Sequence, residues 1–390
     1  MTNTQKKIFV SAGEFSGSMY VSGVLQSLLK SHPDLILEGI GGDELKKIGV
    51  NILHNSDDWG SIGIVEALKR WKLIAINFQV QKYLEQSMPD LILLVDYPGF
   101  NMHLARKAKK LGIPSIYVFP PRKFCVEPDR LTDAVQNIKR VAAEFQPTYD
   151  CYEKAGARVD FVGHPMLDLL PIDQPSELRQ KLGYSSDDFI VLLMPGSRAQ
   201  EINLLLPLYE ETVQKVYDSK KQLKFVLLGA NNFESQQDIK ADLESIHNGL
   251  EKYGVDIDLC WSNRFELMQI ADLALVTSGT ATMELTVYGV PMVICYKVSK
   301  LTEVLAKFFN KLPKFIGLPN LLANDMIVSE FVQENANANA LSQEMLQLID
   351  DQNKRSQLRH QLLEIKEKMG SRGALSRIET MILEELHLNA

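Results

Sequence analysis

A carboxylate at the end of an apolar run is the first candidate for chemistry. In the stretch LLVDYPGFN, residues 93 to 101, Asp96 directly follows a run of apolar residues. Such an aspartate either caps the following turn or serves as a general base. The run has the composition of a buried parallel strand, and ligands of doubly wound folds bind at the carboxyl ends of such strands. The position of Asp96 therefore favours a base.

A Pro-Gly-Ser turn is the second candidate. In LLMPGSR, residues 192 to 198, this turn follows a predicted strand, and Arg198 comes directly after it. Gly196 permits close backbone approach, Ser197 belongs to the same turn, and Arg198 could form two parallel hydrogen bonds to a diphosphate. Such a turn is also common without a ligand, so alone it decides nothing.

A run of small hydroxyl residues is the third candidate. In ALVTSGTATMEL, residues 274 to 285, a predicted strand ends where a helix begins. Ser278, Gly279 and Thr280 would present amide N–H groups at the positive end of that helix, and Glu284 could accept hydrogen bonds from ribose hydroxyls. Together with the Pro-Gly-Ser turn, this favours a nucleotide diphosphate site. Because no lysine of a phosphate-binding loop is present, the nucleotide is predicted to be a leaving group.

The turn near the N-terminus belongs to neither common nucleotide-binding pattern. In IFVSAGEFSGSMY, residues 8 to 20, Gly13 is followed by Glu14, and the next glycine is Gly17, so the dinucleotide fingerprint is not met. Glu14 would repel a phosphate and would rather accept hydrogen bonds from hydroxyls. The alternative is that Ser16 and Gly17 only cap a helix and relieve crowding.

Composition excludes several classes of protein. The 390 residues are 45% hydrophobic and 23% charged, as in ordinary soluble proteins, and the length suggests two or three domains. Residues 1–164 carry 20 basic and 18 acidic side chains, whereas the remainder carries 22 and 31. Neither half is basic enough for a nucleic-acid binder, although the first would tolerate an anionic membrane surface. The N-terminus has no signal pattern and no apolar run is long enough to span a bilayer, so a cytoplasmic location is expected.

The cysteines and histidines show no metal-binding spacing. The four cysteines lie far apart without a C-x-x-C pair, so we expect free thiols, with neither a zinc site nor a disulfide framework: Cys125, Cys151, Cys260 and Cys295. Of the seven histidines, only His164 stands in an unusual local sequence. No metal is predicted.

Strand-like runs alternate with amphipathic helical stretches along the chain. Strands are expected in KIFVSAG, LILEGIGG, PDLILLVD and IPSIYVFP, and again in DFIVLLMP, KQLKFVLLG, VDIDLCW, ADLALVTS and VPMVICYK. A proline-punctuated stretch after residue 160 separates the two series. The pattern predicts two doubly wound α/β domains, which would bind ligands in the cleft between them.

The motifs resemble those of the lipid-A-disaccharide synthases. AGEFSG, SIGIVEALKR, DYPGFN, FVGHPMLD, LLMPGSRAQEI, SGTATMEL, GVPMVICYKVS and LPNLLAN occur in the order and spacing of that family. The resemblance implies a GT-B fold with two Rossmann-like domains. It further implies a glycosyltransferase that joins UDP-linked diacylglucosamine to diacylglucosamine 1-phosphate and releases UDP, without a metal or another cofactor.

The resemblance also implies roles for single residues. It implies that Asp96 is the catalytic base and that UDP is bound by Arg198, Ser278, Gly279, Thr280 and Glu284, with Asn320 and Gln333 close to the same site. The sugar or acceptor side would include Glu14, Ser16, Ser18 and Asn101. We expect an acceptor and lipid domain at 1–164, a UDP-sugar domain at 165–375, and a C-terminal helix at 376–390 that is a candidate to pack back on the first domain.

Two departures from the family pattern fall in the acceptor half. The family usually reads SGD where this chain has Ser16, Gly17 and Ser18, and a tryptophan-containing stretch where this chain reads YVFPPRKFCVE. The departures, at Ser18 and within residues 119–127, leave two alternatives open. One is another GT-B reaction on UDP-N-acetylglucosamine, such as epimerisation or transfer to a different lipid. The other is a catalytically silent protein that binds a UDP-sugar or lipid.

A stretch rich in apolar and basic residues is a candidate lipid-binding surface. Residues 57–84 include four apolar side chains that we assign to a patch for acyl chains and the inner membrane: Ile62, Val65, Leu68 and Trp71. From periodicity alone a buried core helix is equally compatible, and the resemblance favours the lipid surface. Whether two copies form a homodimer is left open by the sequence.

Overall fold

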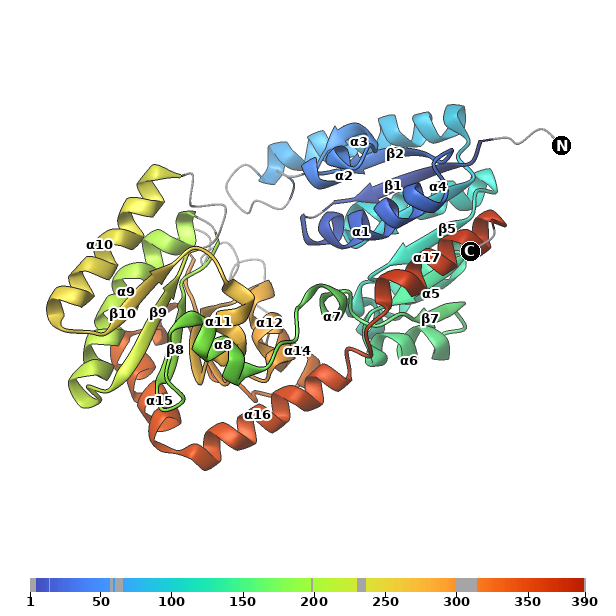
Figure 1. The fold of residues 1–390 in the computed structure, drawn as a ribbon. Coiled ribbons are helices and arrows are strands. Elements are labelled where there is room, and N and C mark those ends of the chain that lie inside the picture. The colour runs from blue at the N-terminus through green and yellow to red at the C-terminus, as the bar shows by residue number, and fades with distance from the viewer. Residues whose placement is uncertain are drawn as a thin grey trace. The chain divides into compact units, whose positions relative to one another are not determined.

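The computed structural model divides the chain into two compact units, each of which is described by itself (Figure 1). It describes residues 5–13, 15–56, 59, 66–197, 199–229, 236–298 and 314–388, and for 15, 16, 66–70 and 200 only the backbone. Unit 1 comprises Met1–Leu169 together with Lys368–Ala390, and unit 2 comprises Leu170–Glu367. The chain therefore leaves unit 1 once and returns to it near the C-terminus.

Unit 1 is built on a seven-stranded parallel sheet with the order β3-β2-β1-β4-β5-β6-β7. Its central strands are apolar and buried along their whole length, as expected when both faces of a sheet are covered. The strands are β1 Lys7–Ala12, β2 Ile36–Gly41, β3 Asn51–Asn55, β4 Leu91–Val95, β5 Ser115–Val118, β6 Arg140–Ala143 and β7 Val159–Phe161.

Helices cover both faces of this sheet. One face packs against α1 Phe15–Ser31, α2 Asp43–Lys47 and α17 Ala374–Leu386, and the other against α3 Glu66–Ser87, α4 Pro98–Leu111, η1 Arg122–Val126, α5 Pro128–Asn137 and α6 Gln146–Lys154. The short α7 Met166–Leu169 ends the first segment of the unit. The alternating strands and helices confirm the predicted α/β class.

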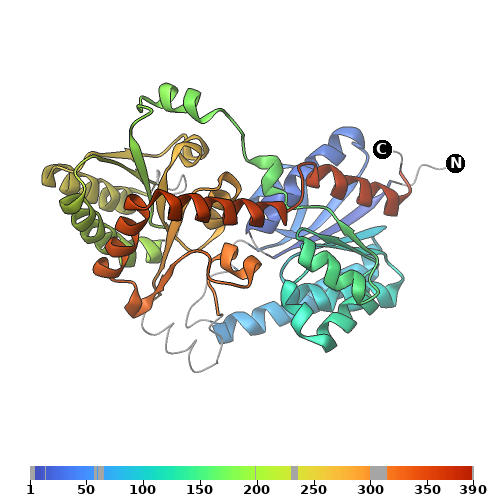
Figure 2. The same ribbon diagram turned by 90° about the horizontal axis from the view of Figure 1, so that it is seen from below.

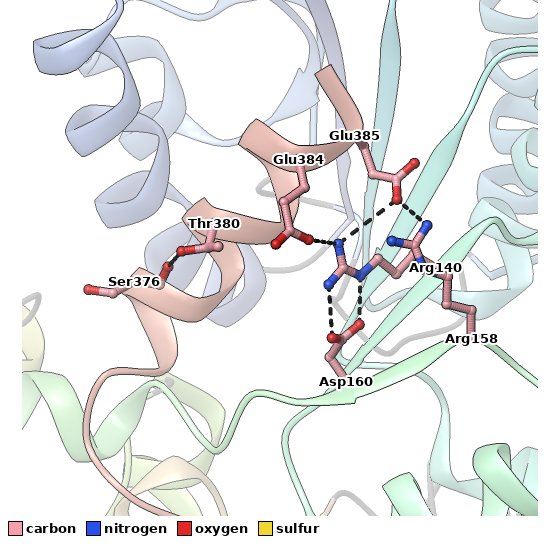
Figure 3. Close-up of polar contacts among 7 residues, drawn as sticks. All are labelled: Arg140, Arg158, Asp160, Ser376, Thr380, Glu384 and Glu385. Carbon is pink, nitrogen blue, oxygen red and sulfur yellow. Dashed lines mark hydrogen bonds and ion pairs between the residues drawn. The ribbon is translucent and has the colours of Figure 1, made fainter. Parts of the chain in front are cut away.

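The C-terminal helix α17 packs against α1, and it also forms ion pairs with arginines in β6 and just before β7, at one edge of the sheet (Figure 3). Arg140 of β6 donates two hydrogen bonds to Asp160 of β7, at 2.6 and 2.8 Å, and a third to Glu384 of α17 at 2.5 Å. Arg158 pairs with Glu385 on the same helix. These contacts fix the returning segment to unit 1.

The start of α17 is capped from within the same unit. Asp168 accepts hydrogen bonds from the backbone N–H groups of Gly373, at 2.5 Å, and Leu375, at 2.8 Å. A carboxylate at this end of a helix satisfies otherwise unpaired N–H groups and favours the helix dipole. The last helix is thus anchored at both of its ends.

Unit 2 repeats the architecture with a six-stranded parallel sheet in the order β10-β9-β8-β11-β12-β13. The strands are β8 Phe189–Met194, β9 Leu223–Leu228, β10 Ile257–Cys260, β11 Leu273–Thr277, β12 Met292–Tyr296 and β13 Glu330–Val332. Helices α9 Ala199–Ser219, α10 Gln237–Tyr253 and α15 Ala338–Asp350 form one packed group (Figure 2). A second group contains α8 Pro175–Leu182, α11 Arg264–Ile270, α12 Thr280–Tyr288, α14 Leu318–Ala323 and α16 Gln352–Glu367, and η3 Gln333–Asn335 follows β13.

The expectation of four free cysteines is wrong for two of them. Cys125 and Cys151 form a disulfide, with their Cα atoms 6.0 Å apart, whereas Cys260 and Cys295 are free. The partners are 26 residues apart in sequence and become neighbours only because η1 and α6 pack together in the folded unit. Sequence spacing alone carries no signal for such a pair. Of the helices described, none is both long and apolar enough to cross a membrane.

Candidate functional site

Asp96 lies at the carboxyl edge of the unit 1 sheet, directly after β4. Its backbone N–H still continues the sheet by donating to the carbonyl of Val118 at 3.1 Å, while its side chain accepts the N–H of Tyr97 at 2.8 Å. A Cβ built on Gly17, in the first turn of α1, would lie 4.0 Å from the Cβ of Asp96. The start of α1 therefore adjoins the carboxylate.

The backbone at this point is strained. Asp96 and Tyr97 have φ angles of +48° and +46°, a left-handed conformation that costs a non-glycine residue about 1–3 kcal/mol. Tyr117 stabilises it by donating its hydroxyl to the Asp96 carbonyl at 2.6 Å. A Cβ at Gly13 would lie 2.4 Å from the Tyr97 ring, so only glycine leaves room for that ring. Two successive residues in this conformation point to a site built for function.

Asn101, predicted on the sugar side, is fully buried and holds this loop in place. Its amide donates to the carbonyls of Asp96 at 2.7 Å and Val95 at 3.1 Å, and its carbonyl accepts the hydroxyl of Ser11 at 2.7 Å. It thus joins β1 to the loop after β4. A contact between Asn101 and a sugar stays a prediction, and its described role is to position Asp96.

The surroundings of Asp96 suit a general base. Burial raises the pKa of this carboxyl, while the Tyr97 N–H and the ammonium group of Lys123 act in the opposite direction. A base is most effective when its pKa lies closer to the operating pH than that of a solvated aspartate. The net upward direction is therefore the one that proton abstraction from a hydroxyl requires.

A second carboxyl at this edge, the buried Glu144, was missed by the sequence analysis. It follows β6 directly, and burial, with a further contribution from Asp96, raises its pKa to about 8 even though Arg122 opposes the change. One of its side-chain oxygens has no hydrogen-bond partner within the described residues. An acidic residue directly after the short run RVAA could have signalled it, because Asp96 follows β4 in the same way.

The remaining unit 1 candidates lie around the same edge or outside the described residues. Ser18 is buried in α1, and its hydroxyl has no partner in the described part of the chain. Glu14 and the side chain of Ser16 are outside the described residues. His164 packs against Tyr20 with ring centroids 5.6 Å apart, and burial lowers its pKa to about 4, so its imidazole is neutral at pH 7.

In unit 2, the Pro-Gly-Ser turn connects β8 to α9. Gly196 has φ +126°, and a Cβ there would lie 2.6 Å from the carboxylate of Glu201, so the turn requires glycine. Glu201, in the first turn of α9, accepts the backbone N–H of Ser197 at 3.2 Å. Arg198 lies outside the described residues. Its contact with a diphosphate therefore stays a prediction.

The run of small hydroxyl residues lies where predicted, between β11 and α12. Gly279 and Thr280 are exposed at the start of that helix, which presents its N–H groups and positive dipole end to a ligand. Ser278 instead donates its hydroxyl to the carbonyl of Ile316 at 2.7 Å. The backbone of this turn, more than the Ser278 side chain, is free to bind an anion.

Glu284 is buried one turn further along α12 and forms an ion pair with Arg264. Burial raises the pKa of Glu284, and the Arg264 guanidinium opposes that change. Arg264, which the sequence analysis missed, begins α11 and lies 20 residues before its partner. The pair fixes one carboxylate oxygen and leaves Glu284 further lone pairs for a ribose hydroxyl.

Asn320 and Gln333 brace the loops near this turn. Asn320 is fully buried, accepts the N–H groups of Ile327 and Val328 at 2.9 Å each, and donates to the Val328 carbonyl at 2.7 Å. Gln333 bonds both the N–H and the carbonyl of Val298. Both side chains thus have structural partners, and their contact with UDP stays a prediction.

The candidate lipid patch is described only in part. Ile62, Val65 and the side chain of Leu68 lie outside the described residues. Trp71, Ile74 and Phe78 on α3 are 74%, 60% and 73% exposed, and their spacing of three and four residues places them on one side of the helix. The buried-helix alternative is therefore wrong for these three positions.

Comparison with known proteins gives matches along almost the whole chain. The LpxB family model, described as lipid-A-disaccharide synthetase, matches residues 8–382. The lipid-A-disaccharide synthase of Geobacter sulfurreducens is 32% identical over 386 residues, and that of Trichlorobacter lovleyi is 33% identical over 380, covering 98% and 97% of both chains. The crystal structure of Acinetobacter baumannii MurG is similar with a TM-score of 0.60 at 15% identity, over 97% of this chain and 99% of that one. This last likeness concerns the fold alone and agrees with the expected GT-B type.

Proposed function

Because the chain belongs to the lipid-A-disaccharide synthetase family, we propose that it joins an acylated glucosamine from a UDP-linked donor to an acylated glucosamine 1-phosphate. The product is the disaccharide of lipid A, and UDP is released. The chain is thus a glycosyltransferase of lipid A biosynthesis. Asp96, in its strained and partly buried loop, is the observation in this structure that carries the proposal.

Asp96 acts as the general base in this reaction. Its carboxylate takes the proton from the acceptor hydroxyl as the hydroxyl oxygen forms a bond to the anomeric carbon of the donor. The bond from that carbon to the UDP oxygen breaks at the same time, so the configuration at the carbon is inverted. Correct placement of a base supplies about 10²- to 10⁴-fold in rate, which explains why Asn101 and Tyr117 hold a strained loop.

Unit 2 binds the departing UDP. The exposed amides at Gly279 and Thr280 and the guanidinium of Arg198 stabilise the negative charge that develops on the diphosphate. Glu284, held by Arg264, accepts hydrogen bonds from the ribose. Asn320 and Gln333 keep the surrounding loops in the binding conformation through their backbone contacts.

The exposed side of α3 holds the enzyme at the cytoplasmic surface of the inner membrane, where its lipid substrates reside. Trp71, Ile74 and Phe78 supply the apolar surface, and the exposed Lys72 lies beside them. Apolar side chains flanked by a basic residue favour binding to an anionic membrane interface. The association is peripheral.

Incubation of the full chain with the diacylated donor and the phosphorylated acceptor tests the function. Mass spectrometry is expected to show the disaccharide 1-phosphate and stoichiometric UDP. Epimerised UDP-sugar without disaccharide would instead assign another reaction of the same fold. UDP binding without turnover of either kind would assign a silent binding protein.

A further inference from the structure

Two adjacent basic residues follow β5 in the stretch where this chain departs from the family pattern. Arg122 is partly buried and Lys123 is exposed, and both begin the short helix η1. Within the described residues, neither side chain has a hydrogen bond or an ion pair. The other described arginines of unit 1 that are at least partly buried all have partners: Arg106 pairs with Asp133, Arg140 pairs with Asp160, and Arg377 donates to the Val162 carbonyl. The cations at 122 and 123 are thus available to a ligand.

The charge on Arg122 is poorly compensated by the protein. Burial lowers the pKa of Arg122, and Glu144 is the acidic group that interacts with it. Since the pKa of Glu144 is raised to about 8, that carboxyl carries a proton for most of the time at pH 7. Glu127, nearby in sequence, forms an ion pair with Arg130. A partly desolvated guanidinium without a counter-ion favours binding of an anion.

The two basic residues are held rigidly beside the candidate base. Phe124 is buried and donates its backbone N–H to the Pro121 carbonyl at 3.0 Å, and Cys125 is joined to Cys151 of α6. Lys123 interacts electrostatically with Asp96. A group bound by this pair therefore lies next to the carboxylate that accepts the proton.

We propose that Arg122 and Lys123 form the subsite for the phosphate monoester of the acceptor sugar. The inference rests on the proposed function, because it names the residues that recognise one substrate of that reaction. The planar guanidinium of Arg122 suits two phosphate oxygens, and the ammonium group of Lys123 supplies a second positive charge. Together they match a group with a charge between about −1.5 and −2 at pH 7.

The test compares Arg122→Gln, Lys123→Gln and the double variant with wild type, using acceptors with and without the 1-phosphate. The double variant is expected to raise the KM for the phosphorylated acceptor about 10- to 100-fold, because charge-assisted hydrogen bonds are lost. The donor KM and UDP affinity are expected to stay within about twofold. The unphosphorylated acceptor is expected to react equally poorly with all forms.

Arg130→Gln is the matched control. It removes the same charge from the neighbouring helix α5, but Arg130 is exposed and paired with Glu127. Its acceptor KM is expected to equal that of wild type. An acceptor KM that is unchanged in the double variant, or raised equally for both acceptors, would overturn the subsite.

Two further measurements distinguish an acceptor-phosphate subsite from a site for lipid headgroups and from a failure of the proposed function. Co-sedimentation with vesicles containing anionic lipid shows whether the pair binds lipid headgroups instead; loss of vesicle binding with an unchanged acceptor KM would overturn the proposal. If wild type makes no disaccharide, the proposed function fails. Calorimetry with glucosamine 1-phosphate then still decides the subsite, because binding by wild type and its loss in the double variant support it, and equal binding contradicts it.

Discussion

The carboxyl edges of the two sheets differ in the groups that they present. In unit 1, the edge has left-handed backbone at the partly buried Asp96, and the buried carboxyl of Glu144 lies two strands away. In the described part of unit 2, the candidate side chains are mostly bonded to neighbouring backbone, as Asn320 is, whereas Gly279 and Thr280 at the start of α12 are exposed.

The difference is the one expected from the two kinds of chemistry in the proposed function. Proton transfer needs a carboxyl whose pKa is raised by desolvation, and that group has to be held against strain. Binding of a diphosphate needs N–H donors and a positive helix end that are already in position, and backbone can supply both. The same α/β architecture therefore specialises through the loops that follow its strands.

The largest effect among the variants that test this difference between the units is expected at Asp96. Asp96→Asn is expected to lower kcat about 10²- to 10⁴-fold, because an amide keeps the shape of the side chain but cannot accept the proton. UDP affinity, measured by calorimetry, is expected to remain within about twofold. Asp90→Asn, at the opposite end of β4, is the control and should keep most of the rate. Retention of most of the rate by Asp96→Asn would reduce Asp96 to a structural cap.

The complementary change is in unit 2. Arg198→Ala is expected to weaken UDP binding by about 2–3 kcal/mol, roughly 30- to 150-fold, because charge-assisted hydrogen bonds to the diphosphate are lost. Lys215→Ala removes a charge from an exposed pair on the same α9 helix and is expected to leave UDP affinity unchanged. Equal UDP affinities of wild type and Arg198→Ala in calorimetry would remove Arg198 from the site.

Glu144 tests the same difference through the pH dependence of the free energy of unfolding. Because its pKa in the folded chain is about 8, above that of an unfolded glutamate near 4.5, the folded state holds a proton that the unfolded state releases. The contribution of the protonated Glu144 to the free energy of unfolding is complete below about pH 4.5, and it is lost as the pH rises to about 8. Glu144→Gln is expected to remove most of that loss, which is on the order of 3 kcal/mol between pH 5.5 and 8.5. Thermal unfolding at pH 5.5 and 8.5 measures it, and identical pH dependence in both proteins would contradict the assignment.

The smallest effect is expected at the surface. Trp71→Glu should weaken co-sedimentation with anionic vesicles several-fold, because it places a charge in the exposed apolar stripe of α3. Ile172→Glu, at an apolar position of unit 2 that is 64% exposed, is the control. Undiminished vesicle binding by folded Trp71→Glu would exclude this side of α3 as the membrane contact.

Long apolar runs were readable from the sequence, and short or mixed strands were not. The runs that form β4, β8 and β11 were predicted at the correct places, because burial on both faces leaves an uninterrupted apolar signature. The strands β3, β6 and β13 are three to five residues long and include polar or charged residues, so no periodicity marks them.

In the candidate site too, features set by one short segment were predicted, and features that depend on distant segments were not. The location of Asp96 followed from one strand and the turn after it. The burial of Glu144, the pairing of Arg264 with Glu284 and the disulfide of Cys125 each depend on elements that are distant in sequence. The spacing of residues in the sequence also could not show that the side-chain amide of Asn101 donates its hydrogen bonds to backbone carbonyls.

The return of the chain to unit 1 has a consequence for biosynthesis. Residues 170–367 form a unit of their own inside the sequence of unit 1, and α17, which covers α1 and the adjoining face of the sheet, is synthesised only after the whole of unit 2. Unit 2 is therefore able to fold before α17 has been made, whereas the unit that carries Asp96 keeps an uncovered apolar face until α17 has followed. Chains that stop before α17 would expose that face to chaperones and proteases, so the unit with the proposed base completes its core only after unit 2 has been made.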